Sequence, residues 1–221
     1  MTGIVLAIDA ATAGGTAAVV DGPRVITAAE TPMRGEPAER LMPTVERLLA
    51  DARIAPWDLA GIVCGGGPGG FTGLRIAASI AKGLASATGA RLFAVSSLLL
   101  IGAGTERPLS AGRYLALLDA MRDERFVARI TIDGGGRHWL EGPAEILATS
   151  SVDATARAEG RTTIGPGCEI DAAPHARGVA RLADSPGCIE PVDLTSWEPS
   201  YGRLAEAQVR WEREHGRRLE G

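Results

Sequence analysis

Apolar runs and turn signals alternate along the first part of the chain. Residues 4–9, IVLAID, form a continuous apolar run that ends in an acid, which predicts a strand buried on both faces. A glycine-containing turn precedes a second strand, TAAVV, and DGP at 21–23 signals a hairpin before a third, RVITAAE. The pattern therefore predicts a three-stranded meander.

Helical spacing follows this meander. Over residues 36–53 apolar positions recur every three or four residues, with charged residues on the other side, so we predict an amphipathic helix. Pro37 suits its first turn, whereas Pro43 should bend the helix or delay its start. The run GIVCG predicts a fourth strand, followed by a glycine-rich loop, a helix to about Thr88 and the strand RLFAVS.

The second half of the chain then repeats the beginning. YLALLDA at 114–120 resembles VLAIDA at 5–10, and each is followed by a polar turn and a hairpin. Asp9 and Asp119 lie about half the chain apart, which indicates an internal repeat, although two apolar strands can also end in Asp-Ala by coincidence. We predict an α/β protein of two similar lobes with mixed sheets and helices, divided into residues 1–104 and 105–221.

The rest of the second lobe is less regular and looks shortened. We predict a helix near GPAEILATS at 142–150, a short strand in TTIGPG, a loop-rich stretch over 168–200 and a charged terminal helix from about Arg203.

The composition of the chain limits the range of functions that it can have. Of the 221 residues, 45% are hydrophobic and 23% charged, as in soluble globular proteins. The net charge of −4 supplies no general field that would draw the chain onto nucleic acid, so any nucleic-acid role should be indirect. Lys82 is the only lysine, which excludes most lysine-dependent catalysis.

The cysteines and the first residues of the sequence indicate the cellular compartment. Three cysteines without CxxC spacing suggest neither a disulfide framework nor a zinc ribbon. The sequence opens on an apolar strand with no basic leader, and no run of 18 apolar residues occurs. We expect a cytoplasmic protein without membrane contact.

The stretch CGGGPGGFTGLR, residues 64–75, raises the question of phosphate binding. Its glycines satisfy GxGxxG between a strand and a helix, but the next strand lacks the acid that would hold a ribose, and no P-loop lysine follows. Two interpretations remain open. Backbone amides at the helix start can hold an anion, assisted by Arg75, or the glycines simply allow a tight crossing and close packing.

The helix from Leu74 to Thr88 is small or apolar nearly all round, and only Arg75 and Lys82 carry charge. Such a helix must be covered on more than one side, and its small residues let another helix approach closely. A small lobe has little to cover it, so we predict a partner protein. The predicted interface residues are Leu41, Val45, Leu48, Arg75, Ile76, Ala77, Ile80, Ala81 and Leu84.

Two lobes that each begin with strand, acid, turn and hairpin resemble the RNase H-like lobes of the actin, sugar kinase and Hsp70 (ASKHA) superfamily, which holds ATP between its lobes. The matching turn of the second lobe, DAMRDERF, lacks glycine and carries two acids where phosphates would lie, although Arg122 and Arg125 offset part of that repulsion. We therefore expect a vestigial cleft. The residues that the resemblance places at a nucleotide are Asp9, Thr12, Gly14 and Gly15.

No catalytic constellation stands out. The three histidines show no metal-ligand spacing, and GxSxG does not occur. We expect no metal site, no catalytic residues and no cofactor.

Several segments together resemble the TsaB (YeaZ) family: IVLAIDAAT, RLMPTVERLL, GGGPGGFTGLRIAASIAKGLA, LLDAMRDERFVA and, more weakly, EPSYGR at 198–203. The resemblance implies a non-catalytic bacterial subunit that binds and activates a TsaD-like paralogue in the synthesis of N6-threonylcarbamoyladenosine at tRNA position 37. It also implies a TsaE-like ATPase partner, self-association through the same surface when alone, and a possible nucleotide at the joint interface. The interface helices would be 36–53 and 74–88.

The chain departs from the family in two places. Pro37 stands where members usually have a histidine, and the stretch before EPSYGR lacks a long amphipathic helix. Two alternatives are a small ATP-dependent phosphotransferase of the same fold and an M22-type metallopeptidase. The latter would need a metal and a histidine pair that the sequence does not offer.

Overall fold

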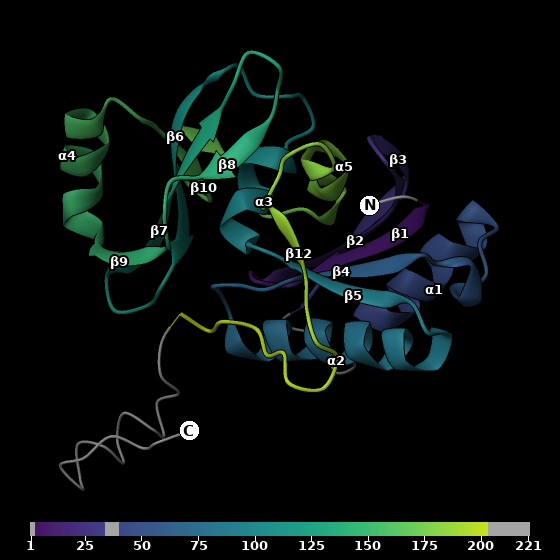
Figure 1. Cartoon of the computed structure of the whole chain (residues 1–221). Coiled ribbons are helices and arrows are strands. Elements are labelled where there is room, and N and C mark those ends of the chain that lie inside the picture. Colours follow the sequence, from purple (N-terminus) through teal and green to yellow (C-terminus); the bar gives the residue numbers. More distant parts are fainter. Residues whose placement is uncertain (1–2, 34–39, 203–221) are drawn as a thin grey trace, which may run out of the picture.

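A computed structural model describes residues 3–33 and 40–202, which form two mixed sheets flanked by helices (Figure 1). In the first sheet, β1 lies between its antiparallel hairpin partner β2 and the parallel strand β4. The strands follow the order β12-β5-β4-β1-β2-β3, with β1 (Ile4–Asp9), β2 (Gly14–Asp21), β3 (Arg24–Pro32), β4 (Gly61–Gly65), β5 (Arg91–Val95) and β12 (Ile189–Pro191).

The second sheet repeats this arrangement. Again an antiparallel meander comes first, and the next strand joins parallel to the first one. Its order is β11-β10-β6-β7-β8, with β9 on β7, and its strands are β6 (Gly112–Asp119), β7 (Glu124–Ile132), β8 (His138–Leu140), β9 (Glu145–Ala148), β10 (Thr162–Gly165) and β11 (Ile170–Asp171).

The repeat extends to single hydrogen bonds. The Asp9 carboxylate accepts from the Ala11 amide at 3.0 Å, and the Asp119 carboxylate accepts from the Met121 amide at 2.9 Å. The predicted two-lobed α/β fold is therefore confirmed.

Helices cover the first sheet on both faces. On one face lie α1 (Leu41–Ala52) and α2 (Phe71–Thr88), with the short helix η1 (Pro56–Asp58) beside them. Between the two sheets lie α3 (Ser97–Ala103), η2 (Ala176–Gly178) and α5 (Val179–Leu182), while α4 (Thr149–Glu159) covers the outer face of the second sheet (Figure 1).

The start of α1 agrees with the expectation for Pro43. The helix begins at Leu41, so Pro43 lies in the first turn, where its missing amide hydrogen breaks no helical hydrogen bond. Residues 36–39 of the predicted helix lie outside the described residues.

The predicted helix at 142–150 is wrong. Residues 145–148 form β9, which pairs antiparallel with β7, and α4 begins only at Thr149. The backbone groups of this segment are satisfied by a distant strand, which local pattern does not reveal. On α4 only Val152 and Ala156 are buried, so the sequence of this helix shows no clear repeat of apolar residues at helical spacing. The predicted terminal helix from Arg203 lies outside the described residues.

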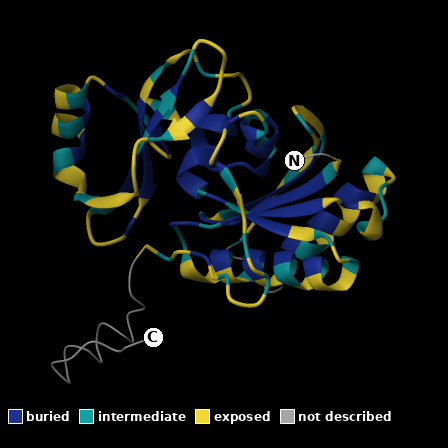
Figure 2. Ribbon diagram, viewed as in Figure 1, coloured by how far each residue is buried: buried dark blue, intermediate teal, exposed yellow. Residues whose placement is uncertain are grey.

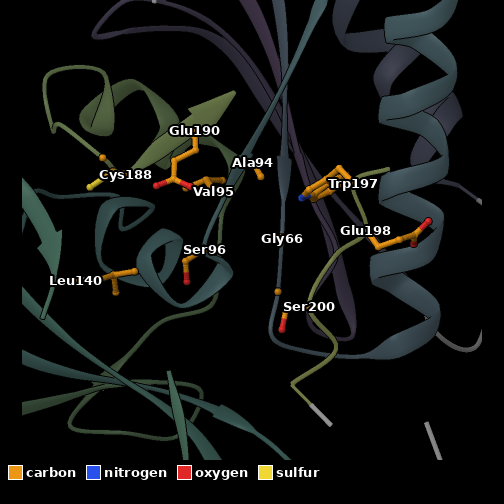
Figure 3. Close-up of a pocket in the computed structure, with 12 residues that line it drawn as sticks. Gly66, Ala94, Val95, Ser96, Leu140, Cys188, Glu190, Trp197, Glu198 and Ser200 are labelled. Carbon is orange, nitrogen blue, oxygen red and sulfur yellow. The ribbon is translucent and has the colours of Figure 1, made fainter. Parts of the chain in front are cut away.

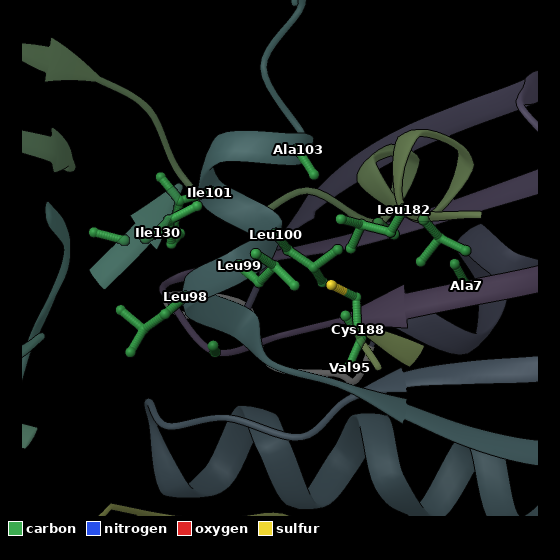
Figure 4. Packing of buried hydrophobic residues seen from close by; sticks show 14 of the residues in the cluster. Ala7, Val95, Leu98, Leu99, Leu100, Ile101, Ala103, Ile130, Leu182 and Cys188 are labelled. Carbon is green, nitrogen blue, oxygen red and sulfur yellow. The ribbon is translucent and has the colours of Figure 1, made fainter. Parts of the chain in front are cut away.

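The two sheets share one hydrophobic cluster, centred on α3. All seven residues of α3 are buried, and its leucine, isoleucine and alanine side chains lie in one cluster with Ala7 of β1, Ile130 of β7 and Leu182 of α5 (Figure 4). Figure 2 shows this buried centre, whereas α4 and the outer side of α2 are exposed. The boundary at residue 104 stays a prediction, because α3 packs on both sheets and β12 joins the first sheet.

The lobes differ in one respect that matters for function. The first lobe has α2, of 18 residues, between β4 and β5. At the matching place, between β10 and β11, the second lobe has only residues 166–169. Within residues 105–202, the second lobe therefore has no counterpart of this long small-residue helix.

Candidate functional site

The glycine-rich loop packs against the β1–β2 turn. A Cβ added at Gly69 would lie 2.6 Å from the Ala11 Cβ, and one at Gly73 would overlap the Ala10 carbonyl oxygen. These glycines let the start of α2 lie directly on the turn, as the packing interpretation requires. The helix itself begins at Phe71, three residues earlier than predicted.

Amides of the loop that an anion would need are used within the protein. The Gly66 amide donates to the Val95 carbonyl at 2.7 Å, and the Gly70 amide donates to the Ala11 carbonyl at 2.7 Å. The Gly67 amide donates to the Ser97 hydroxyl oxygen at 3.1 Å. The geometry therefore favours the packing interpretation over an anion site at these three amides.

Asp9 is buried, and both oxygens of its carboxylate accept hydrogen bonds. Its carboxylate accepts hydrogen bonds from the Ala11 amide at 3.0 Å and from the Ser97 hydroxyl at 2.5 Å. Burial raises the pKa of Asp9, and the two hydrogen bonds oppose that shift. Because Ser97 also accepts from Gly67, Asp9 links the end of β1 to the glycine-rich loop and the start of α3.

The other predicted nucleotide residues lie in or beside β2. Gly14 and Gly15 pair with β3, and Gly15 is buried beneath Met33 and Leu41. The Thr12 hydroxyl bonds within its own turn, donating to the Gly14 carbonyl and accepting from the Gly14 amide, both at 3.3 Å. Their assignment to a nucleotide stays a prediction.

The matching turn of the second lobe has an unusual backbone. Met121, Arg122 and Asp123 all lie in the left-handed region, with φ of 63°, 57° and 58°. This conformation is uncommon for residues other than glycine. Met121 as a whole residue is 65% exposed at this turn. No sequence signal indicated this conformation.

The structure divides the predicted interface residues into two groups. Five of them pack in the core of the first lobe between the helices and the sheet, and so do not form its outer surface. Arg75 is exposed, and three isoleucine or leucine side chains are half-buried. The buried five are Leu41, Val45, Leu48, Ala77 and Ala81.

The solvent side of α2 carries, beside the exposed Arg75, a row of small and apolar side chains without charge. We call this row the outer stripe. It consists of exposed Thr72, Ser79, Gly83, Ser86 and Ala87 with half-buried Ile76, Ile80 and Leu84. A Cβ added at Gly83 would meet no atom within 4 Å, so a neighbouring backbone can approach closely there.

Both charged residues of α2 lie beside the outer stripe. The Arg75 guanidinium stacks on the Phe71 ring at 5.2 Å from its centroid. The Lys82 ammonium donates to the Trp197 carbonyl at 2.9 Å. The role that the sequence left open for Arg75 thus includes a contact with the aromatic ring at the helix start.

A segment from the far end of the chain covers this flank of α2. We call residues 193–202 the strap. Its Ser200 amide donates to the Gly66 carbonyl at 2.8 Å, and its Tyr201 ring lies 4.6 Å from the Phe71 ring. Figure 3 shows it crossing beside α2 and the glycine-rich loop. Sequence reasoning noted EPSYGR only as a weak motif and missed this contact.

A cavity of about 310 Å³ opens between the loop, the end of β5, β12 and the strap (Figure 3). Glu190, Glu198 and two serine hydroxyls supply its polar groups, and no basic side chain is among the described residues that line it. Its walls are Gly66, Gly67, Ala94, Val95, Ser96, Leu140, Gly187, Cys188, Glu190, Trp197, Glu198 and Ser200.

Within residues 3–33 and 40–202, no three or more His, Cys, Asp and Glu side chains gather in a way that could hold a metal ion. In the same ranges no helix has the length and apolar character to span a bilayer.

Two sheets of one strand order, each with an acid at the end of its first strand, define a two-lobed α/β protein of the ASKHA type. A family model described as "TsaD: tRNA N6-adenosine threonylcarbamoyltransferase" matches residues 36–182, more than half of the chain. The protein TsaB of Bacillus subtilis, named for tRNA threonylcarbamoyladenosine biosynthesis, is 30% identical over 189 residues, which cover 78% of this chain and 82% of that protein. The chain belongs to the TsaB (YeaZ) family.

Other comparisons agree with this assignment. The solved structure of YeaZ from Pseudomonas aeruginosa superimposes with a TM-score of 0.76 at 29% identity, covering 91% of this chain and 100% of that one. An uncharacterized protein of Mycobacterium leprae is 43% identical over 130 residues, which span 57% of this chain but only 35% of that longer protein.

Proposed function

We propose that the chain is a non-catalytic subunit in the synthesis of tRNA N6-threonylcarbamoyladenosine, where it binds and activates a TsaD-like threonylcarbamoyltransferase. Membership of the TsaB family supports the process. The observation that carries the binding role is the uncharged outer stripe on α2.

The stripe has the properties of a helix-packing surface. Ser79 and Gly83, four residues apart, are small and exposed, so the backbone of a partner helix can approach closely there. Ile76 and Ile80 supply partly exposed apolar area whose burial would favour association. We propose that a helix of the TsaD-like partner packs here.

We propose further partners in addition to the TsaD-like protein. Without the TsaD-like protein, two copies of this chain would associate through the stripe, and a TsaE-like ATPase would join the heterodimer. We propose that tRNA is reached through the partner, since the net charge of −4 supplies no general attraction for phosphates. We propose that the chain has no cofactor of its own and that a nucleotide binds, if at all, at the joint interface.

The test is co-purification with the TsaD-like protein of the same organism, followed by size-exclusion chromatography with light scattering. We expect a heterodimer for the native chain and its loss in Gly83→Arg, because the arginine fills the open space on the stripe. Gly134→Arg is the matched control, since a Cβ there also meets no atom within 4 Å but lies in the second lobe.

The outcomes separate two errors. If the native chain binds no TsaD-like protein, the proposed function is wrong. If Gly83→Arg binds as tightly as Gly134→Arg, the partner docks elsewhere. Calorimetry with ATP and Mg²⁺ tests the catalytic alternative, and micromolar binding to the isolated chain would favour the phosphotransferase.

A further inference from the structure

Lys82, the only lysine of the chain, is tied to the strap. Its ammonium donates to the Trp197 carbonyl at 2.9 Å and lies 3.7 Å from a carboxylate oxygen of Glu198. The Lys82 side chain is 25% exposed. The strap therefore holds the ammonium on one flank of α2.

Without this tie, the ammonium would lie next to the outer stripe. Residues three and four apart on a helix are surface neighbours, so Lys82 adjoins Ser79 and Ser86, both exposed on the stripe. The stem of a lysine is long and flexible, and it can carry the charge across these small side chains. A charge at that place would be covered by whatever packs on the stripe.

Covering a charge without a partner group is unfavourable, because the ammonium loses its water. The strap prevents this by giving Lys82 a carbonyl and a carboxylate away from the stripe. Resting on the function proposed above, we infer that the strap is a positioning element of the docking surface. It keeps the Lys82 ammonium off the stripe, so that Arg75 is the one exposed charged residue of α2 beside the surface on which a helix of the TsaD-like partner packs.

The tie can be altered without dislodging the strap. Ser200 is held to Gly66 through backbone atoms, which do not involve the Glu198 side chain, and the Tyr201 ring packs on Phe71 while its hydroxyl donates to the Glu198 carboxylate. Because the Glu198 side chain is 69% exposed, the loss of its contacts with Lys82 and Tyr201 should change the melting temperature only slightly.

The test is a double-mutant cycle on the dissociation constant with the TsaD-like partner. We expect Glu198→Lys to weaken binding about tenfold, because it repels the Lys82 ammonium onto the stripe. In a Lys82→Met background the same change should have little effect, and Lys82→Met alone should bind at least as tightly as the native chain. The swapped pair Lys82→Glu/Glu198→Lys should recover part of the affinity, because it re-forms the ion pair although a glutamate cannot donate to the Trp197 carbonyl. Glu169→Lys, an exposed change of the same charge in the second lobe, is the control.

The outcomes of this cycle distinguish a failure of the inference from a failure of the proposed function. If Glu198→Lys weakens binding equally in both backgrounds, the strap does not act through Lys82 and the inference is overturned. It is also overturned if Lys82→Met alone weakens binding, since Lys82 would then contact the partner. If the native chain itself binds no TsaD-like protein, the failure lies in the proposed function.

Discussion

At the scale of single residues, the Asp9 carboxylate, which the superfamily resemblance places at a nucleotide, links the end of β1 to the start of α3. Asp9 accepts from Ser97 at 2.5 Å, and Ser97 in turn accepts from the Gly67 amide at 3.1 Å. Removing the shared hydroxyl would leave a buried carboxylate oxygen and a buried amide without this partner. Buried groups left unsatisfied in this way are costly.

Ser97→Ala should therefore destabilise the fold by about 2–3 kcal/mol. Thermal unfolding followed by circular dichroism measures the effect. Ser96→Ala is the matched control, because the neighbouring hydroxyl does not cap α3. Equal melting temperatures for the two variants would show that the Asp9 link contributes little.

A second residue-scale feature sets a dependence on pH. His175 is 4% exposed, and its Nδ1 accepts from the Arg177 amide at 3.0 Å. Burial, reinforced by the Arg177 charge, lowers the pKa of His175 from 6.5 to about 4. Glu30 lies 3.3 Å from Nε2 and favours protonation, but it is 66% exposed and its charge is screened by water.

Because the folded pKa lies below the unfolded one, the unfolded chain binds the proton more readily. The contribution of neutral His175 is fully present above pH 6.5 and falls by roughly 3 kcal/mol as the pH drops to about 4. His175→Asn keeps an acceptor for the Arg177 amide but does not titrate. Denaturant unfolding between pH 4 and 7 should show a flatter stability profile for this variant, and parallel profiles would contradict the assignment.

At the scale of elements, α2 contains two glycines with opposite surroundings. A Cβ at Gly73 would overlap the Ala10 carbonyl oxygen, whereas one at Gly83 would meet nothing within 4 Å. Gly73 is required by close packing against the β1–β2 turn. Gly83 is not required by packing, so its main effect on stability is that glycine loses more conformational freedom in a helix than alanine does.

The two substitutions should therefore change stability in opposite directions. Gly83→Ala is expected to raise the free energy of unfolding by about 0.5–1 kcal/mol, because alanine favours the helix. Gly73→Ala should lower it by about 2 kcal/mol or more, since backbone must move. Urea unfolding of the pair checks this, and a loss of stability in Gly83→Ala would show that another group lies over the stripe.

Some elements could be predicted from sequence and others could not. The meanders and α2 follow from local patterns: continuous apolar runs, turn residues and a small-residue helix behind glycines. The strand β9 and the strap depend on distant partners, since β9 pairs with β7 and Lys82 meets Trp197 across 115 positions. The spacing of apolar and polar residues within a segment does not indicate such distant pairings. For the same reason the sequence could not separate the buried face of α2, with Ala77 and Ala81, from its outer stripe.

At the scale of the whole molecule, the two lobes are joined through α3. Its residues are buried between the sheets, and one cluster contains β1 and β5 of the first lobe together with β6 and β7 of the second. Each sheet therefore relies on α3 to cover part of its inner face. Lobes that share a core in this way should unfold together, unlike domains that meet across a polar interface.

Leu99, at 0% exposure, tests this coupling. Leu99→Ala should destabilise the chain by roughly 3 kcal/mol and still give one calorimetric transition whose enthalpy equals the van't Hoff value. Hydrogen exchange should accelerate in β1 and in β7 alike. Ile146→Ala is the control, since its side chain is 37% exposed on β9 and both sheets should keep their protection. Two separate transitions, or faster exchange in one sheet only, would mean that the lobes are independent units and that α3 belongs to one of them.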